Sequence, residues 1–257
     1  MMVTSNSREL YIDQLKRSLM DWLNVDVPAE VIDPENLDSM VSEAWLEHFL
    51  FGRAVTFCGM AELDNLQACA ERCLEDAVAG DFMECGVWRG GATILLRGIL
   101  AAHGVTDRRV WVADSFEGLP PPPPGSLEEV IYNHEAVVRS NHMAVDLETV
   151  KNNFARYGLL DGQVRFVKGW FKDTLPDLDV ERLAILRLDA GSYSATMDIL
   201  GSLYDKVSPG GYVIIDDWGF DQICGVRKAV EEFRAERSIA DAIAMADWRC
   251  GFWRKSR

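Results

Sequence analysis

The fold is decided by FMECGVWRGG, residues 82–91, in which an apolar strand runs into a glycine-bearing turn and a helix begins after Gly91. Gly86 allows the backbone to turn tightly and to approach a ligand, because glycine carries no Cβ. The spacing Gly86-x-x-x-Gly90 is not the dinucleotide fingerprint G-x-G-x-x-G, and the stretch lacks the Lys-Ser/Thr of a phosphate-binding loop. Glu84 would repel a pyrophosphate, so the turn favours an amine-bearing ligand. A purely structural turn is the alternative interpretation.

Apolar strands alternate with helices on the C-terminal side of this turn. Strands are predicted at residues 82–85, 110–113, 164–167, 183–188 and 212–215, with two short candidates at 242–246 and 250–253. Helices are predicted near residues 91–102, 146–157, 194–206 and 225–236. Such alternation indicates an α/β protein with a mostly parallel sheet and helices on both faces. With the last two strands closing as a hairpin, the pattern predicts a seven-stranded Rossmann-like sheet.

Helices are also predicted before the turn. Residues 9–23 place four apolar side chains at helical spacing: Ile12, Leu15, Leu19 and Trp22. Residues 64–76 form a second helical pattern. We interpret residues 1–75 as an N-terminal helical extension and residues 76–257 as the main domain.

Composition excludes several classes of protein. The net charge of -15 argues against nucleic acid as a partner, because phosphate binding requires a basic face. No apolar run is long enough to cross a membrane, and the N-terminus lacks the pattern of a signal peptide. The six cysteines form no C-x-x-C pair, which favours buried free thiols over a zinc site. These features together predict a cytoplasmic protein.

A second strand ends in an acidic residue. Asp114 closes the stretch VWVADS, residues 110–115, one strand–helix unit after the first turn. A carboxylate in this place can accept hydrogen bonds from both hydroxyls of a ribose. Asp and Ser also cap helices and turns, which is the alternative interpretation. Together with the turn that contains Glu84, this position favours S-adenosylmethionine, which carries both an amino acid and a ribose.

Three further carboxylates follow two buried strands. Asp189 ends the stretch LRLD, and Asp216 and Asp217 end the stretch YVIIDD. Neighbouring parallel strands would bring these carboxylates together, where they repel one another unless protons or a cation neutralise them. Carboxylate oxygens suit Mg²⁺ or Ca²⁺, and such an ion could bind two hydroxyls of a substrate and lower the pKa of one. Simple caps at the strand ends are the alternative.

Two more segments lie at strand ends. Gly169, Trp170 and Phe171 follow the third strand, and the aromatic pair could flank an adenine ring or pack in the core. Residues 117–145 contain five consecutive prolines, 120–124, which exclude a helix or a central strand. Because ligands bind at this end of α/β sheets, we predict a lid or substrate loop, with a surface linker as the alternative.

With these motifs in place, the sequence resembles the macrocin O-methyltransferase family, bacterial enzymes that methylate sugar hydroxyls of natural products. The matching stretches are Glu84–Gly91, Trp111–Gly118, Tyr157–Leu160, Val164–Thr174, Arg187–Asp189, Tyr193, Thr196–Asp198 and Ser208–Asp217. The beginning of the first helix, Glu9–Tyr11, and residues 59–66 are also similar. The resemblance thus covers most of the chain.

The resemblance implies the class I methyltransferase fold, S-adenosylmethionine as methyl donor, dependence on Mg²⁺, and a homo-oligomer. The acceptor would be a deoxysugar hydroxyl of a glycosylated natural product, a small-molecule glycoside. The implied cofactor-binding residues are Thr56, Glu84, Gly86, Val87, Trp88, Arg89, Gly90, Asp114, Ser115, Gly169, Trp170 and Phe171. The implied metal ligands are Asp189, Asp216 and Asp217.

One departure from the family concerns the catalytic base. The family has Asp-x-Asp before a tyrosine, whereas this chain has Asp189-Ala190-Gly191, and Gly191 cannot take a proton. Asp189 is then a candidate base, as are His142 and His134 of the lid segment; alternatively, the metal acidifies the hydroxyl alone, or transfer is weakened. Two other functions stay open: a homologue that binds S-adenosylmethionine with weak or no transfer, and an NAD-dependent oxidoreductase, which the missing fingerprint opposes.

Overall fold

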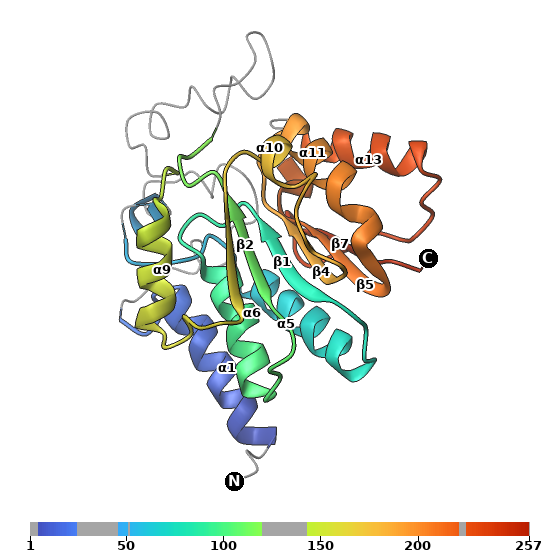
Figure 1. The fold of residues 1–257 in the computed structure, drawn as a ribbon. Coiled ribbons are helices and arrows are strands. Elements are labelled where there is room, and N and C mark those ends of the chain that lie inside the picture. Colours follow the sequence, from blue (N-terminus) through green and yellow to red (C-terminus); the bar gives the residue numbers. More distant parts are fainter. Residues whose placement is uncertain (1–4, 25–45, 51, 120–142, 221–224, 257) are drawn as a thin grey trace.

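The computed structural model describes residues 5–24, 46–50, 52–119, 143–220 and 225–256 (Figure 1). Its centre is a seven-stranded sheet with the strand order β3-β2-β1-β4-β5-β7-β6. The strands are β1 (Asp81–Cys85), β2 (Val110–Asp114), β3 (Val164–Lys168), β4 (Leu183–Leu188), β5 (Val207–Ile215), β6 (Ala244–Met245) and β7 (Gly251–Arg254). Strands β1 to β5 are parallel, and β7 is antiparallel to β5 and β6. The predicted seven-stranded, mostly parallel sheet is therefore confirmed.

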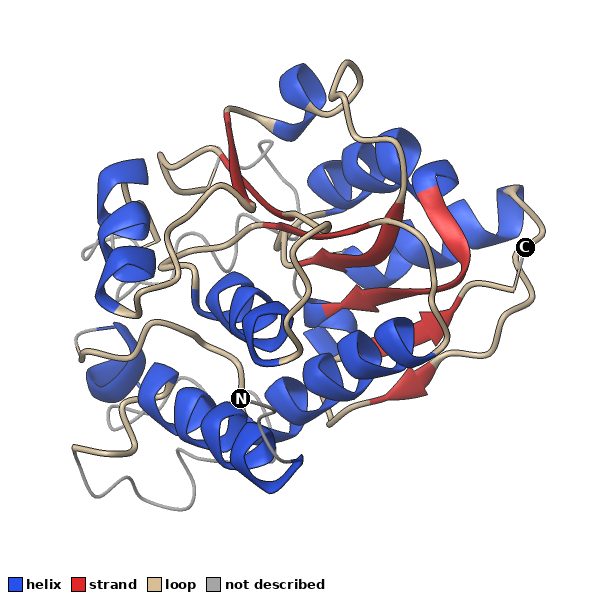
Figure 2. Cartoon of the chain, turned by 60° about the horizontal axis from the view of Figure 1, so that its bottom comes forward, coloured by secondary structure: helices blue, strands red, loops and turns tan. Residues whose placement is uncertain are grey.

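Helices cover both faces of this sheet, as Figures 1 and 2 show. One face carries α1 (Ser5–Leu19), α5 (Met60–Glu75), α6 (Gly91–Ala102) and α9 (Leu147–Arg156). The other carries α10 (Phe171–Thr174), α11 (Tyr193–Leu203) and α13 (Val226–Glu236). Short helical turns also occur at η1 (Leu46–Leu50), η2 (Tyr204–Lys206) and η3 (Asp216–Phe220).

The strand side chains divide between two apolar cores, because successive residues of a strand point to opposite faces. Phe82 and Ile185 are fully buried against α1, α5 and α6. Met83 and Leu186 are fully buried against α11 and α13. The central strand β4 is buried along its whole length, and this includes the charged residue Arg187. A guanidinium in this position requires partners, since an unpaired buried charge is strongly destabilising.

The observed elements differ from the sequence pattern mainly at their ends. Strand β5 begins at Val207, five residues before the predicted strand, because Val207 pairs with Leu183 of β4 and because Gly210 and Gly211 exchange backbone hydrogen bonds with Lys255. Helix α1 ends at Leu19, since Asp21 adopts a left-handed conformation with a φ of 59°. The five described cysteines are free and buried, as predicted.

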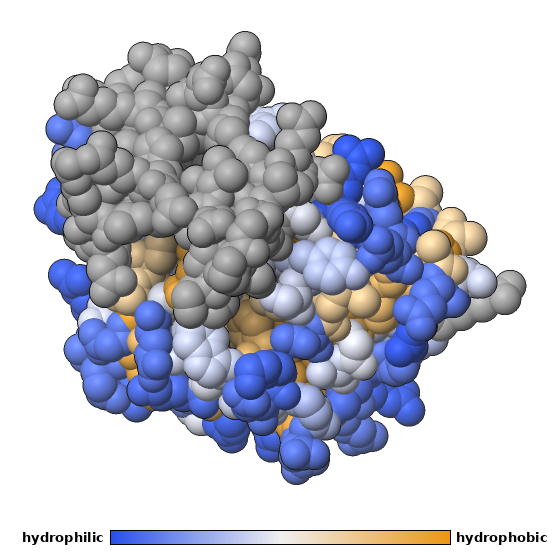
Figure 3. Space-filling view, turned by 90° about the horizontal axis from the view of Figure 1, so that it is seen from above, coloured by the Kyte–Doolittle hydropathy of each residue, from blue (hydrophilic) through white to orange (hydrophobic). Residues whose placement is uncertain are grey.

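The surface above the carboxyl ends of the parallel strands is mixed. Seen from that side, hydrophilic residues form most of the described rim, and apolar residues lie toward its middle (Figure 3). Among the described helices, none combines the length and apolar character that a membrane span requires.

Helix α1 shares the core of the main domain. Ile12, Leu15 and Leu19 are buried, and α1 packs along α6. Contact between the helices is close at Gly98, where a Cβ would lie 2.3 Å from a methyl group of Leu15. The division of the chain into an extension, residues 1–75, and a domain, residues 76–257, stays a prediction; the packing of α1 indicates that its removal would expose the core.

A pair of leucine substitutions on α1 tests this packing. Leu15→Ala should lower the free energy of unfolding by about 2–5 kcal/mol, because it opens a cavity in the core. The matched control is Leu10→Ala on the same helix, where the side chain is 59% exposed; its effect should stay within about 0.5 kcal/mol. Both values can be measured by urea unfolding. Equal effects of the two substitutions would show that α1 is not part of the cooperative core.

Candidate active site

The turn after β1 lies directly against the end of β4. Gly86 has a φ of +88°, and a Cβ there would lie 1.9 Å from the carbonyl oxygen of Asp189. Two backbone hydrogen bonds of 2.9 Å hold this region, from Gly86 to Ala113 and from Asp189 to Cys85. Glycine is therefore required both by the left-handed backbone and by the close approach. Trp88 in the same turn also has a positive φ, 48°, a conformation that a large side chain rarely adopts.

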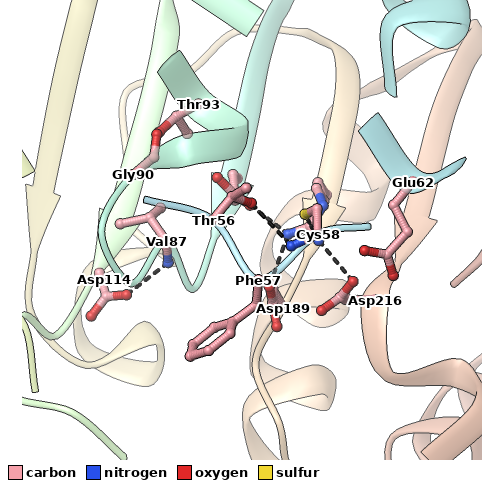
Figure 4. A network of polar contacts seen from close by, with 12 residues as sticks. Thr56, Phe57, Cys58, Glu62, Val87, Gly90, Thr93, Asp114, Asp189 and Asp216 are labelled. Atoms are coloured by element: carbon pink, nitrogen blue, oxygen red, sulfur yellow. Dashed lines mark hydrogen bonds and ion pairs between the residues drawn. The ribbon is translucent and has the colours of Figure 1, made fainter. Parts of the chain in front are cut away.

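Asp114 at the end of β2 connects two turns. Its Oδ2 accepts a hydrogen bond of 2.8 Å from the backbone N–H of Val87 (Figure 4). Its Oδ1 accepts one of 2.7 Å from the backbone N–H of Phe116. Burial raises the pKa of Asp114, while these backbone donors act in the opposite direction. The hydroxyl of Ser115, 3.4 Å from Oδ1, and the backbone N–H of Trp88 also donate to Asp114, so a ligand hydroxyl would share the carboxylate with these groups or displace one of them.

A cavity of about 450 Å³ opens at the carboxyl ends of the parallel strands. Eight predicted site residues line it: Gly86, Trp88, Asp114, Ser115, Gly169, Trp170, Phe171 and Asp189. The lining residues that the sequence did not single out as site residues are Phe57, Gly118, Leu119, Met143, Lys172, Ala190, Ser194, Ala195 and Asp198. The size lies within the range of sites for small molecules and cofactors.

The other predicted cofactor residues do not line this cavity but contact the residues and turns that do. Thr56 Oγ1 accepts a hydrogen bond from the backbone N–H of Cys58 (Figure 4), and Val87 donates to Asp114. Gly90 has a φ of 91° and precedes the first turn of α6. Glu84 is buried and pairs with a cation of the protein itself, Arg187. Contact of these residues with a cofactor stays a prediction.

Arg89 and Trp88 fasten the N-terminal segment to the glycine turn. Arg89 Nη1 donates to the carbonyl oxygens of Ala54 at 2.7 Å and Gly52 at 3.0 Å. The ring of Phe57 stacks on that of Trp88, with 3.8 Å between the centroids. Phe57 thus forms part of the cavity wall, although the sequence around it shows no pattern of a strand. The sequence gives no specific sign of this role, because the contact depends on how residues 52–58 fold back.

The three carboxylates predicted as metal ligands lie together. Asp189, Asp216 and Asp217 each offer an oxygen within 4.8 Å of the others, and Figure 4 shows Asp189 beside Asp216. The side chain of Asp189 is 31% exposed and lines the cavity, whereas that of Asp216 is 2% exposed. The arrangement forms one acid cluster at the ends of β4 and β5; its role in metal binding stays a prediction.

Two buried arginines accompany this acid cluster. Arg187 on β4 donates to Asp189 at 3.0 Å and to Asp216 at 2.8 Å. Arg249, before β7, forms a pair with Glu62 of α5 at 2.7 Å and lies 3.5 Å from Asp216. We did not assign either arginine to the site from the sequence. An arginine inside the apolar stretch LAILRL, residues 183–188, is a signal for Arg187, whereas Arg249 lies in an irregular segment with no such signal.

Carboxyl groups outnumber guanidinium groups in this region. The carboxyl groups of the region are those of Glu62, Glu84, Asp189, Asp216 and Asp217, and they outnumber the two guanidinium groups. Burial and the charge of Asp216 raise the pKa of Asp189 well above its usual range and that of Asp217 to about 6. The donor set is composed of hard oxygen atoms in excess of the guanidinium groups, which fits a divalent cation such as Mg²⁺ or, alternatively, bound protons.

Gly191, which stands where the family has its second aspartate, adopts a left-handed backbone conformation. Gly191 has a φ of +64°, and its N–H donates a hydrogen bond to Asp217. Gly191 therefore orients a carboxylate of the acid cluster through its backbone. The alternative bases His142 and His134 lie outside the described residues, as does most of the predicted lid, residues 117–145. Its described ends contribute Gly118, Leu119 and Met143 to the cavity wall.

The seven-stranded sheet and its helices form the fold of class I methyltransferases. The solved structure of the O-methyltransferase NovP is 40% identical, with a TM-score of 0.81, and the match covers 97% of this chain and 100% of that one. The sequence also resembles, more weakly, the calicheamicin rhamnose methyltransferase. Its solved structure, a TDP-rhamnose 3'-O-methyltransferase, is 18% identical with a TM-score of 0.52 over 99% of this chain and 96% of that one, which shows the fold alone.

The chain belongs to the macrocin O-methyltransferase (TylF) family, whose model matches residues 9–255. A tetracenomycin-rhamnosyl 4'-O-methyltransferase of Streptomyces olivaceus is 44% identical over 98% of this chain and 95% of the relative. The mycinamicin III 3''-O-methyltransferase of Micromonospora griseorubida is 44% identical over 99% of this chain and all of the relative. The protein is thus an O-methyltransferase, and the alternative of an NAD-dependent oxidoreductase is wrong.

Removing a buried arginine should destabilise the protein far more than removing an exposed one. Arg249→Met leaves the buried Glu62 without its ion-pair partner and removes one of the two guanidinium groups near Asp216, so the free energy of unfolding should fall by about 3–5 kcal/mol. Arg237→Met is the matched control, because Arg237 also binds a carboxylate through two contacts, 2.7 and 2.8 Å from Asp205, but at the surface. The control should lose less than about 1 kcal/mol. Comparable losses in chemical unfolding would contradict a buried ionic network.

Proposed function

We propose that the protein is an S-adenosylmethionine-dependent, divalent-metal-assisted O-methyltransferase that acts on a deoxysugar hydroxyl of a glycosylated natural product. One observation carries the proposal: Asp189 belongs both to the wall of the cavity and to the acid cluster. A donor bound in the cavity and an acceptor bound at the acid cluster would therefore meet at this residue. Methyl transfer requires such a meeting, because the reacting atoms must be held in contact and in line.

The cavity offers the groups that a donor of this kind needs. S-adenosylmethionine supplies an electrophilic methyl group on a sulfonium. Asp114 would accept hydrogen bonds from the ribose, and Ser115 lies next to it in the wall. Trp170 and Phe171 would flank the adenine with apolar surface. The backbone of Gly86 would lie along the amino-acid part, because no Cβ obstructs it.

The acceptor class is proposed from the relatives. Their names describe methylation of a rhamnosyl group on tetracenomycin, of mycinamicin III and of demethyldecarbamoylnovobiocin, at 41–44% identity. By this similarity we expect a small-molecule glycoside as partner. That the chain forms a homo-oligomer, lies in the cytoplasm and binds no nucleic acid stays a prediction.

The chain's own carboxylates would prepare the acceptor. Asp189, Asp216 and Asp217 would hold Mg²⁺ (or Ca²⁺), whose charge favours the deprotonated form of a bound hydroxyl. Asp189 is the member of the acid cluster that lines the cavity, so its carboxylate is the described group best placed to take the proton of the hydroxyl. His142 remains a proposed alternative base. Phe57 and Trp88 would shield the donor from water on the side of the N-terminal segment.

The donor site can be tested with Asp114→Asn and S-adenosylhomocysteine, the demethylated donor. The substitution removes the ribose acceptor and points an amide N–H₂ toward backbone donors, so the Kd should rise at least about tenfold, equal to 1.4 kcal/mol. Asp81→Asn is the control, because Asp81 also accepts hydrogen bonds from a backbone N–H and from Trp111, but at the start of β1. Calorimetric titration measures both. Wild-type protein that binds neither S-adenosylmethionine nor S-adenosylhomocysteine would refute the proposed donor.

Metal dependence is tested by turnover in EDTA. Mycinamicin III and demethyldecarbamoylnovobiocin serve as trial acceptors, with methyl transfer followed by mass spectrometry. Chelation should abolish transfer, and excess Mg²⁺ should restore it, because the acid cluster would lose its cation. Full activity in EDTA would contradict metal assistance. Tight donor binding without transfer to any glycoside tried would favour the alternative of a homologue with weak or no transfer.

A further inference from the structure

One guanidinium group lies at the centre of the polar groups below the cavity. Arg187 Nη1 donates to Glu84 Oε1 and, at 3.0 Å, to Asp189 Oδ2. Its Nη2 donates to Asp216 Oδ1 at 2.8 Å and to the sulfur of Cys58 at 3.1 Å. Four acceptors therefore match the four N–H groups that the two Nη atoms carry. The side chain of Arg187 is only 2% exposed, so water does not compete for these bonds.

These bonds join carboxylates from three neighbouring strands. Glu84 lies on β1, Asp189 follows β4, and Asp216 follows β5. Arg187 binds one defined oxygen of each, and no bond of Arg187 goes to Asp189 Oδ1 or Asp216 Oδ2. Asp216 is also within hydrogen-bond distance of Asp189 and Glu62, contacts that a bound cation would replace. Glu84 Oε2 is buried and has no hydrogen-bond partner among the described residues. The guanidinium of Arg187 thus determines which oxygen of each carboxylate forms an ion pair with the protein itself.

Without Arg187 the acid cluster would not keep this arrangement. Asp189 and Asp216 are near enough to share a hydrogen bond, so two charged carboxylates would separate if nothing held them. Arg249 cannot replace Arg187, because its short contacts go to Glu62 and it lies 3.5 Å from Asp216. Among the described residues, Arg187 is the cation that contacts both Asp189 and Asp216.

We propose that Arg187 is a positioning residue of the methyltransferase site, which holds Asp189 and Asp216 so that their uncommitted oxygens can bind one divalent cation. This inference rests on the proposed function. It adds a role for a residue that touches neither the donor cavity nor, on this geometry, the cation.

Lysine in this position separates positioning from simple charge balance. Arg187→Lys keeps the buried positive charge, so the carboxylates are not left without a cation. One ammonium group cannot reproduce the planar fork of a guanidinium that serves several carboxylates at once. The matched control is Arg97→Lys. Arg97 lies on α6, is 8% exposed and binds both carboxylate oxygens of Asp161. Neither residue lines the cavity.

The experiment titrates Mn²⁺ and, separately, S-adenosylhomocysteine into wild type, Arg187→Lys and Arg97→Lys in a calorimeter, with thermal unfolding recorded for each. Wild type should bind both probes. Arg187→Lys should bind Mn²⁺ about 10–100-fold more weakly, the usual effect of losing a partner that orients a metal ligand, and S-adenosylhomocysteine with nearly unchanged affinity. Arg97→Lys should bind both probes as wild type does, even where its stability falls.

Each other result has a distinct meaning. Unchanged Mn²⁺ affinity in Arg187→Lys would overturn the positioning role, and equal loss of both probes would make Arg187 a purely structural residue. Wild type that binds S-adenosylhomocysteine but not Mn²⁺ would remove the ligand role and this inference with it. Wild type that binds neither probe would instead refute the proposed function.

A crystal structure of wild type grown with Mg²⁺ tests the same geometry without a substitution. Asp189 Oδ2 and Asp216 Oδ1 should remain bonded to Arg187 while the ion takes the other oxygens of the acid cluster. An ion bound to those two committed atoms, or a displaced Arg187 side chain, would overturn the proposal.

Discussion

The close contact between the turn after β1 and the end of β4 is the constraint on which the rest of the site depends. These two strands are neighbours in the sheet, but the chain leaves β1 in one direction and reaches β4 only after β2 and β3. Ligands of α/β proteins bind at such a reversal of strand order, because the connections diverge there and leave a crevice. Gly86 keeps the crevice narrow at its base, where its backbone touches that of Asp189. The donor cavity and the acid cluster meet at this contact.

Electrostatics then determine how the base of the crevice is built. A sheet centre made of β1, β4 and β5 would ordinarily be apolar, yet Glu84, Arg187 and Asp216 are almost fully buried in it. Burying such charges is costly, and replacing them with apolar residues often stabilises a protein. Their presence is easier to explain by function than by stability, since Arg187 contacts Asp189, the carboxylate of the acid cluster that lines the cavity. The remaining excess of carboxyl groups is a property that a methyltransferase with a cation could use.

The sequence predicts the sheet and the residues at its strand ends better than the contacts between residues that are distant in the chain. Strand positions, the glycine turn, Asp114 and the acid cluster follow from period, spacing and the rule that parallel strands end at one edge. Phe57 could not be predicted, because its place in the wall depends on stacking with Trp88 from a segment without regular structure. The partner of Glu84 was also missed: the sequence suggests a cationic ligand, whereas the structure shows that Arg187 binds one of its oxygens. Contacts between distant residues leave no periodic signal in a single sequence.

The pair formed by Arg249 and Glu62 has a consequence for how the molecule matures. These residues are separated by 187 positions, so one comes from the helix before the first strand and the other from the turn before the last. Closing so long a loop is slow compared with forming local structure. The charges around Asp216 reach their final balance only when the last strand has docked. A chain that ended before Arg249 would leave Asp216 with Arg187 as its one neighbouring guanidinium group among the described residues, so the charge balance of the acid cluster depends on the last stretch of the sequence.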